Sequence, residues 1–176
     1  MAPPHLDQER LQAMAAQISM WTKVDPELLE TLRLPGFMFR LTEKLLWEAF
    51  DQFFDGFRAK GAYVFECQRS RYLGLLPTWD PWEVIASMGT HADNFDLDTE
   101  QIISWLTALN RDQPFTLCGA GYDFVAGRFV TKIESSRTVA RRIFEFCPDA
   151  VTELTGSLPA LALSIKRRRE FLLWWD

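Results

Sequence analysis

The chain has 176 residues, of which 48% are hydrophobic and 14% aromatic, values typical of a packed globular protein. Its formal net charge of −5 and pI near 5.1 argue against a nucleic-acid partner, because neutralising phosphates requires an excess of Lys and Arg. No apolar run reaches the ~20 residues of a membrane helix, and the N-terminus lacks the order of a signal peptide. We therefore expect a cytoplasmic protein with neither a nucleic-acid nor a membrane partner.

The three cysteines are Cys67, Cys118 and Cys147, which lie far apart and form no CxxC pair. An odd number of isolated cysteines is typical of reduced thiols in a cytosolic protein. We expect neither a disulfide framework nor a zinc site.

Residues 1–34 predict two helices. The first, over residues 6–20, has apolar residues at helical spacing, namely Leu11, Met14, Ala15 and Ile18. The second begins at Asp25-Pro26, a capping acceptor followed by a proline at the first helical position, and ends before Pro35-Gly36. Its apolar stripe is Leu28, Leu29 and Leu32. We interpret residues 1–34 as a helical appendage.

The next segment predicts a strand over 37–41 and then the most strongly patterned helix of the chain. Thr42 is the expected N-cap of this helix. Its apolar stripe is Leu45, Leu46, Ala49, Phe50, Phe53, Phe54 and Phe57. Strands follow over 62–67 and 71–76. A stripe of this kind predicts a helix packed across a sheet.

Two further helix starts precede the C-terminal third. The run Asp80-Pro81-Trp82-Glu83 has the order of a capping box, and Gly89 supplies the stop. Residues 91–100 form an acidic loop that leads into the next helix, and Asp98 is the expected cap of that helix. The buried stripe of that helix is Ile102, Trp105, Leu106 and Leu109.

The last third, from Pro114 to Asp176, predicts a β-hairpin, two helices and a final strand. We expect Gly119-Ala120-Gly121 to form a bulge or a close approach, and Ala126-Gly127 to be the turn between strands 122–125 and 128–133. The helix capped by Ser135 or Ser136 breaks at Pro148. A second helix starts after Ser157, and residues 171–175 form the final strand.

These elements predict an α+β fold. We expect a single domain over residues 35–176, in which amphipathic helices pack a small mixed or antiparallel sheet. An edge strand of such a sheet could support an oligomer.

The C-terminal part resembles a bacterial family known only as domain of unknown function 4253. The resembling residues are Phe146-Cys147-Pro148-Asp149, Val151, Gly156-Ser157-Leu158, Leu161 and Trp174-Trp175-Asp176. Upstream, the similar segments are Met88-Gly89-Thr90, the Ile102 to Leu106 helix and Pro114-Phe115 to Phe129. The resemblance covers about residues 73–176, although Glu153-Leu154 stands where a Gln-Gly pair is expected. The family implies no activity, substrate or cofactor.

The thiol of Cys147 is the sharpest candidate for catalysis. It lies near the end of a helix and beside Asp149, and both features raise a thiol pKa, whereas a nucleophile needs a lowered one. The only histidines are His5 and His91, so a Cys147/His91 dyad with Asp93 as its orienting group is the one arrangement available. We interpret Cys147 as a buried structural residue.

A second candidate is the carboxylate of Asp123 in the predicted hairpin. It stands between Tyr122 and Phe124, so we expect partial burial and a need for a hydrogen-bond donor. Arg128, across the predicted turn, could supply that donor. Structural pairing is the preferred interpretation.

The acidic loop contains the candidate metal ligands His91, Asp93 and Asp96. The glycine and the ligand spacing of a calcium loop are missing. Aspartates at such positions are common for local hydrogen bonding alone. We therefore interpret the segment as a solvated loop and expect no metal ion and no cofactor.

The terminal tryptophans are candidate ligand-binding residues. In a strand, Trp174 and Trp175 point to opposite faces, so one enters the core and the other is covered or available to a ligand. The run Lys166-Arg167-Arg168-Arg169 either caps the last helix or faces an acidic partner.

The favoured function is a non-enzymatic binding or protein-interaction module that recognises a partner through an acidic loop and an exposed aromatic face. The alternative is a small hydrolase or metal-dependent enzyme that uses the His91/Asp93/Asp96 loop with Cys147 or Asp123. Spatial convergence of these polar groups separates the two hypotheses.

Overall fold

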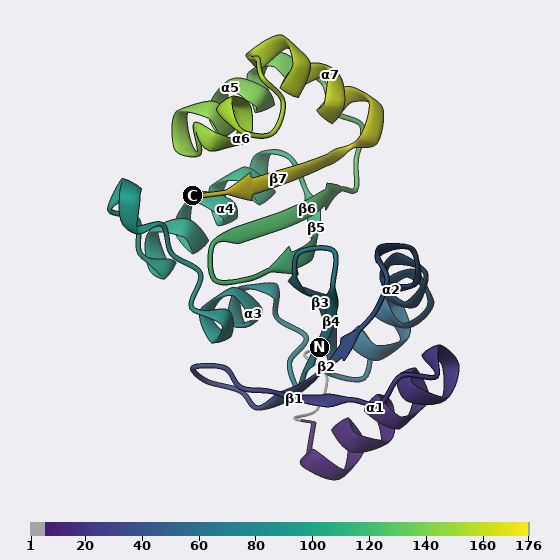
Figure 1. The fold of residues 1–176 in the computed structure, drawn as a ribbon. Helices are drawn as coiled ribbons and strands as arrows, with labels where there is room; N and C mark the ends of the chain where they lie inside the picture. The colour runs from purple at the N-terminus through teal and green to yellow at the C-terminus, as the bar shows by residue number, and fades with distance from the viewer. Residues whose placement is uncertain (1–5, 176) are drawn as a thin grey trace. The chain divides into compact units, whose positions relative to one another are not determined.

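The computed structural model describes residues 6–175, which have an α+β fold (Figure 1). Two compact units are present. The first contains the chain up to Gly89 together with Gly119–Gly121, and the second contains Thr90–Cys118 and the chain from Tyr122 onward. Within the described range, no helix is both long and apolar enough to cross a membrane. His5 and Asp176 lie outside the described residues.

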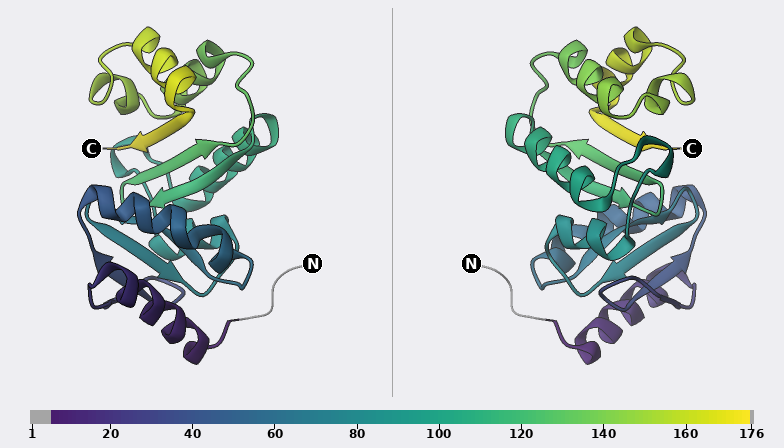
Figure 2. Two further views of the ribbon diagram at one scale, coloured as in Figure 1. Left: turned by 90° about the vertical axis from the view of Figure 1, so that its right-hand side faces the viewer. Right: turned by 90° about the vertical axis from the view of Figure 1, so that its left-hand side faces the viewer.

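The first unit is a sheet with helices on both faces. Its elements are α1 (Gln8–Thr22), β1 (Glu27–Leu29), β2 (Gly36–Arg40), α2 (Glu43–Arg58), β3 (Tyr63–Gln68), β4 (Tyr72–Leu76) and α3 (Pro81–Met88). The strand order is β1-β2-β4-β3, with antiparallel neighbours. Gly119 pairs in parallel with Glu66 of β3, so the sheet is mixed and the predicted close approach of Gly119 is a strand pairing. Helix α2 covers one face and α3 the opposite face (Figure 2).

Helix α2 forms as its sequence predicts. The Thr42 side chain accepts a hydrogen bond from the Leu45 backbone N–H at 3.4 Å, which satisfies one free donor of the first turn. The predicted stripe is buried except for Leu45, which is half-buried, and the Phe50 and Phe54 rings stack with centroids 4.7 Å apart. The Phe54 ring also meets Tyr63 of β3 edge-on at 5.3 Å.

Helix α1 is confirmed as well. The Asp7 side chain accepts a hydrogen bond from the Arg10 backbone N–H at 2.9 Å. All four residues of its predicted stripe are buried. At the last turn, the Trp21 ring meets Phe53 of α2 edge-on at 5.9 Å, so α1 packs beside α2.

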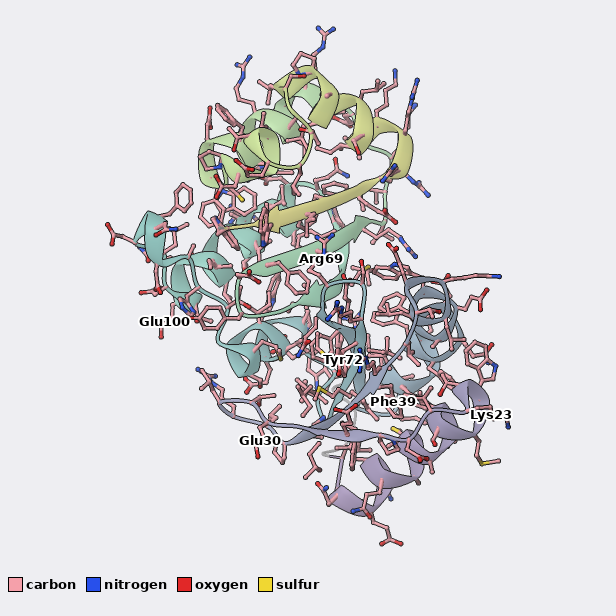
Figure 3. The ribbon with its side chains drawn as sticks, viewed as in Figure 1. Lys23, Glu30, Phe39, Arg69, Tyr72 and Glu100 are labelled. Carbon is pink, nitrogen blue, oxygen red and sulfur yellow. The ribbon has the colours of Figure 1, made fainter. Side chains whose placement is uncertain are left out.

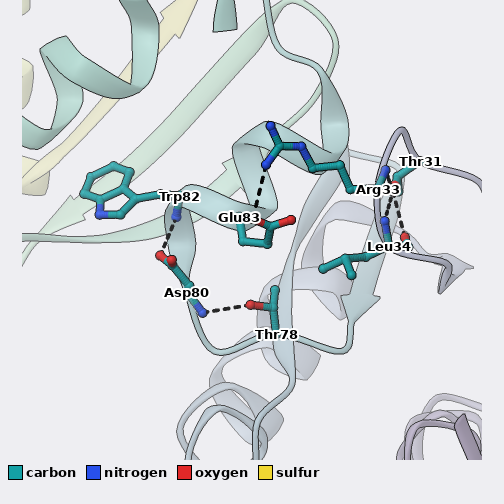
Figure 4. Close-up of polar contacts among 7 residues, drawn as sticks. All are labelled: Thr31, Arg33, Leu34, Thr78, Asp80, Trp82 and Glu83. Atoms are coloured by element: carbon teal, nitrogen blue, oxygen red, sulfur yellow. Dashed lines mark hydrogen bonds and ion pairs between the residues drawn. The ribbon is translucent and has the colours of Figure 1, made fainter. Parts of the chain in front are cut away.

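The second helix predicted in residues 25–34 is wrong. Residues Glu27–Leu29 form β1, which pairs antiparallel with β2. The Thr31 hydroxyl donates to the Leu34 carbonyl at 2.7 Å and accepts from the Leu34 N–H at 3.0 Å, so the chain turns where the helix was expected to continue (Figure 4). The pairing of β1 with β2 therefore determines the structure of this segment, because a short stripe of leucines does not stabilise a helix by itself.

The start of α3 has the predicted cap without the reciprocal glutamate. The Asp80 carboxylate accepts from the Trp82 N–H at 2.9 Å, and the Asp80 N–H donates to the Thr78 hydroxyl at 3.1 Å (Figure 4). The Glu83 side chain instead pairs with Arg33 at 3.4 Å. Gly89 ends the helix in the left-handed region, as expected.

The second unit has three strands and a group of helices beside them. Its elements are the 3₁₀ helix η1 (Asp93–Phe95), α4 (Thr99–Asp112), β5 (Phe115–Ala120), β6 (Phe124–Phe129), α5 (Ser136–Phe146), α6 (Asp149–Thr152), α7 (Leu158–Arg168) and β7 (Glu170–Trp174). The strand order is β5-β6-β7, and β6 and β7 are antiparallel. Helices α5, α6 and α7 gather on the side of β7 that faces away from β6 (Figures 1 and 2).

The predicted hairpin turn at Ala126-Gly127 is wrong. Strand β6 runs without a break from Phe124 to Phe129, and Gly127 pairs with Phe171 of β7. A Cβ atom at Gly127 would lie 2.5 Å from Phe171 Cζ and 2.9 Å from Phe115 Cδ2. The glycine therefore makes room for two phenylalanine rings and does not form a turn.

The helix caps of the second unit follow the sequence prediction. Asp98 and Gln101 form a reciprocal capping box at α4. Ser135 caps α5, and Ser157 caps α7, each by accepting a backbone N–H at 3.3 Å. The break at Pro148 and the final strand are also confirmed.

Candidate functional site

A cluster of polar and aromatic side chains surrounds the turn between β5 and β6 in the second unit. The His91 backbone N–H donates to the Tyr122 carbonyl at 3.0 Å. The His91 ring meets the Tyr122 ring edge-on, with centroids 4.1 Å apart. The Tyr122 side chain nonetheless remains 64% exposed. An exposed aromatic ring is thus held in one place by its neighbour.

The acidic loop joins this cluster through Asp93. The Asp93 carboxylate lies 3.4 Å from His91 Nε2, and its side chain is 83% exposed. The bridge between Ala92 and Leu97 closes the loop, and Asp96 is exposed with a left-handed backbone. Figure 3 shows Glu100, which lies in the first turn of α4 where the loop ends. The loop therefore places the Asp93 carboxylate next to His91, whose ring packs on Tyr122.

The three candidate metal ligands do not form a coordination group. Among the described residues, no three His, Cys, Asp or Glu side chains gather closely enough to hold a metal ion. Asp98 uses its carboxylate to accept the Gln101 N–H at 2.8 Å, which is a local structural role. The chemistry available to His91 and Asp93 is that of an imidazole and a carboxylate 3.4 Å apart at the surface.

Asp123 has a different partner from the predicted one. Its carboxylate accepts a hydrogen bond from Trp174 Nε1 at 3.2 Å, and its carbonyl accepts from the Trp175 N–H at 3.0 Å. Arg128 instead pairs with Glu170 at 3.1 Å. The half-buried carboxylate thus fixes the end of β7 to the β5–β6 turn.

The prediction that the Cys147 thiol is buried is confirmed. The thiol is inaccessible and donates to the Trp174 carbonyl at 3.2 Å. Burial, with a smaller effect of the Asp149 carboxylate, raises its pKa to about 11. The thiol is therefore neutral near pH 7, which is the opposite of what a nucleophile needs.

The two terminal tryptophans have different environments, as expected for neighbours in a strand. Trp174 is half-buried and bonded to Asp123, whereas Trp175 is buried. The Trp175 ring meets Phe146 edge-on at 5.9 Å, and Phe146 stacks on Trp105 of α4 at 4.3 Å. Trp175 is thus a core residue, and Trp174 is the one nearer to solvent.

The candidate residues meet through a chain of contacts. Asp93 touches His91, which packs on Tyr122, and the next residue, Asp123, binds Trp174. Sequence reasoning named four of these five residues but missed Tyr122 as the exposed element. The available signal was the glycine-rich segment directly before Tyr122, because glycines mark turns and connecting segments run over the surface.

A second polar residue missed in the sequence is Glu66 of β3, in the first unit. Its carboxylate is buried and accepts the Ser70 N–H at 2.5 Å, where Ser70 has a left-handed backbone. Burial raises the pKa of Glu66 from 4.5. This arrangement supports the turn between β3 and β4.

The comparisons with known proteins identify a family only. No curated protein and no solved structure matches the chain significantly. One family model does match, described as a domain of unknown function, and it covers residues 72–176. This range agrees with the predicted resemblance. Because the match includes more than half of the chain, the protein belongs to the family of domain of unknown function DUF4253.

Proposed function

We propose that the protein is a non-enzymatic interaction module of the bacterial cytoplasm that recognises a cationic segment of another protein. The recognition surface consists of Tyr122, His91, Asp93 and Asp96, here called the Tyr122 surface. The observation that supports it best is the Tyr122 ring, which is 64% exposed yet held edge-on by His91 at 4.1 Å.

The chemistry of the Tyr122 surface favours a positively charged partner. A Lys or Arg side chain over an exposed tyrosine ring gains about 0.5–2 kcal/mol from the cation–π interaction. Asp93 and Asp96, both exposed, add carboxylates for the same cation or its neighbours. A ring that is already fixed loses little conformational entropy on binding, which is a property of interface hot spots.

The cytoplasmic location rests on the cysteines. All three are buried, and none of them forms a disulfide. Burial raises the pKa of the Cys67 and Cys147 thiols to about 12 and about 11. Such thiols suit a reducing compartment, where no disulfide is needed for stability.

The proposal is tested by binding of a labelled arginine-rich peptide, measured by fluorescence anisotropy. We expect Tyr122→Ala and the double variant Asp93→Asn/Asp96→Asn each to weaken binding by roughly fivefold to tenfold, because each removes an attraction of about 1 kcal/mol. Tyr122→Phe should bind like the wild type, since the ring face is retained.

The matched control is Glu27→Gln/Glu30→Gln, which removes two exposed carboxylates from the β1 segment. This variant should bind the peptide as the wild type does. Equal losses in the control and in the Asp93/Asp96 variant would show non-specific attraction to a net negative protein, and the proposal would then be wrong.

The alternative function, a metal-dependent hydrolase, is supported only by the His91–Asp93 pair at 3.4 Å. It predicts that Mg²⁺, Mn²⁺ or Zn²⁺ raises the melting temperature by several degrees, because a ligand that binds the native state stabilises it. The interaction proposal predicts no shift. A thermal-shift screen with divalent metals and nucleotides separates the two functions.

A further inference from the structure

Charge is distributed unevenly along this chain. Residues 128–169 contain nine Lys and Arg against four Asp and Glu, while the rest of the chain contains ten against twenty. A protein of net charge −5 thus has a strongly cationic segment, which lies entirely in the second unit. Charge asymmetry of this kind is a feature of binding surfaces more than of stability.

The cations at the end of α7 are brought beside those at the end of β6. The Phe129 N–H donates to the Arg169 carbonyl at 2.7 Å, and Arg128 pairs with Glu170 at 3.1 Å. The chain from β6 toward Lys132 therefore starts alongside the end of α7. The cationic patch is defined here as Lys132, Lys166, Arg167, Arg168 and Arg169, all of which are exposed.

Helix capping accounts for only part of the patch. The dipole of α7 favours cations in its last turn, by typically 0.3–1 kcal/mol each, but the effect falls off within that turn. Lys132 lies outside the helix, and no ion pair links the five patch residues to a carboxylate within residues 6–175. The attraction of the patch for an anion is thus not used by a carboxylate of the described residues.

Two exposed aliphatic side chains accompany these cations. Leu163 is 47% exposed and lies three and four residues before Lys166 and Arg167, on the same side of α7. Val130 is exposed directly after β6. Aliphatic groups favour contact with the side chains of a protein, whereas single-stranded nucleic acid is bound by exposed aromatic rings.

We infer that the cationic patch binds an acidic, leucine-containing segment of a partner protein. Three of its five cations are arginines, whose planar guanidinium groups bind carboxylates through two hydrogen bonds. The twenty acidic residues outside the cationic segment repel a long polyanion or an anionic membrane, while a short acidic peptide meets only the local positive field. This surface is separate in sequence and in charge from the Tyr122 surface.

The test uses the full chain and a labelled twelve-residue peptide of alternating glutamate and leucine, with a lysine–leucine peptide of equal length for comparison. We expect the glutamate peptide to bind and Arg167→Gln/Arg168→Gln to weaken it by roughly tenfold, since two charge pairs of up to about 0.7 kcal/mol each are lost. Lys44→Gln/Lys60→Gln, with the same change in net charge, should leave binding within about twofold.

Two other ligands complete the experiment. Single-stranded DNA and vesicles containing phosphatidylserine are titrated under the same salt conditions. Tighter binding of either one than of the acidic peptide would overturn the inference, as would equal effects of the two double variants. Because Arg167 and Arg168 are exposed, circular dichroism should show an unchanged fold in the patch variant.

Discussion

Among single residues, Cys147 shows how one buried thiol helps to fix the end of a strand. Its S–H donates to the Trp174 carbonyl, so the end of β7 is bonded on both sides, to Asp123 and to the helix break. A buried thiol that is bonded in this way contributes to packing, and its raised pKa keeps it uncharged.

We expect Cys147 to resist iodoacetamide at pH 7.5 in the native protein. Both its burial and its pKa of about 11 reduce the fraction of accessible thiolate. Mass spectrometry of peptides from native and urea-unfolded protein measures the rates. Rapid native labelling of Cys147, at a rate near that of the unfolded chain, would contradict this role.

Glu66 gives the free energy of unfolding a defined pH dependence. Burial raises its folded-state pKa above 4.5, so its stabilising contribution is complete below pH 4.5 and is lost as pH rises through the folded-state pKa. Glu66→Gln keeps an oxygen for the Ser70 N–H and cannot ionise. The variant should therefore gain stability relative to the wild type between pH 4 and pH 7 in urea titrations. A difference that does not change with pH would refute this assignment.

Helices and strands whose signals lie within their own residues, such as a cap or an apolar stripe, could be predicted from the sequence. Elements that depend on contacts with distant residues could not. Helix α2 has both a cap and a stripe within sixteen residues. Strand β1 depends on pairing with β2, and the shape of β6 depends on Phe171, more than forty residues away. These contacts join residues that are apart in the sequence, so the periodicity of a short segment does not predict them.

The same reason applies to the site. His91, Asp93, Asp123 and Trp174 could be named from their chemistry, but the partner of Asp123 could not. Trp174 lies 51 positions further along the chain, and only the β6–β7 pairing brings its indole to the carboxylate. The exposure of Tyr122 likewise follows from the turn that joins two strands.

Substitutions of two glycines test the packing described for β6 and α2. Gly127→Ala should destabilise the protein by about 1–3 kcal/mol, because its Cβ has no space beside Phe171 and Phe115. Gly56→Ala in α2 should stabilise it by up to about 1 kcal/mol, since the added methyl group meets nothing within 4 Å and alanine favours helix. Chemical denaturation of both variants measures the two effects. Equal and small effects would mean that β6 is not packed as described.

The end of β7 should be essential for stability. Trp175→Ala removes an indole that is 3% exposed and packs on Phe146, so we expect a loss of about 3–5 kcal/mol. Trp79→Ala, which truncates an exposed tryptophan, is the matched control and should cost far less. A Trp175→Ala protein that melts at the wild-type temperature would place this strand outside the core.

Over the whole molecule, most of the chain carries an excess of acidic residues, and one segment is cationic. Each of the two proposed surfaces uses one sign of charge. Electrostatic attraction between exposed groups is screened over about 8–10 Å at physiological salt. Binding at either surface should therefore weaken as salt rises, while the fold, which rests on buried apolar residues, should change little.

Site-specific photo-crosslinking tests most directly whether Tyr122 contacts a partner protein. Benzoylphenylalanine is placed at position 122 in growing bacterial cells, with position 79 as the control for an exposed aromatic site. We expect one discrete crosslinked protein from position 122, none from position 79, and loss of the product in the Asp93→Asn/Asp96→Asn background. Identical crosslinking patterns at the two positions, or a product unaffected by removal of the two carboxylates, would show that the Tyr122 surface does not bind a partner in this way.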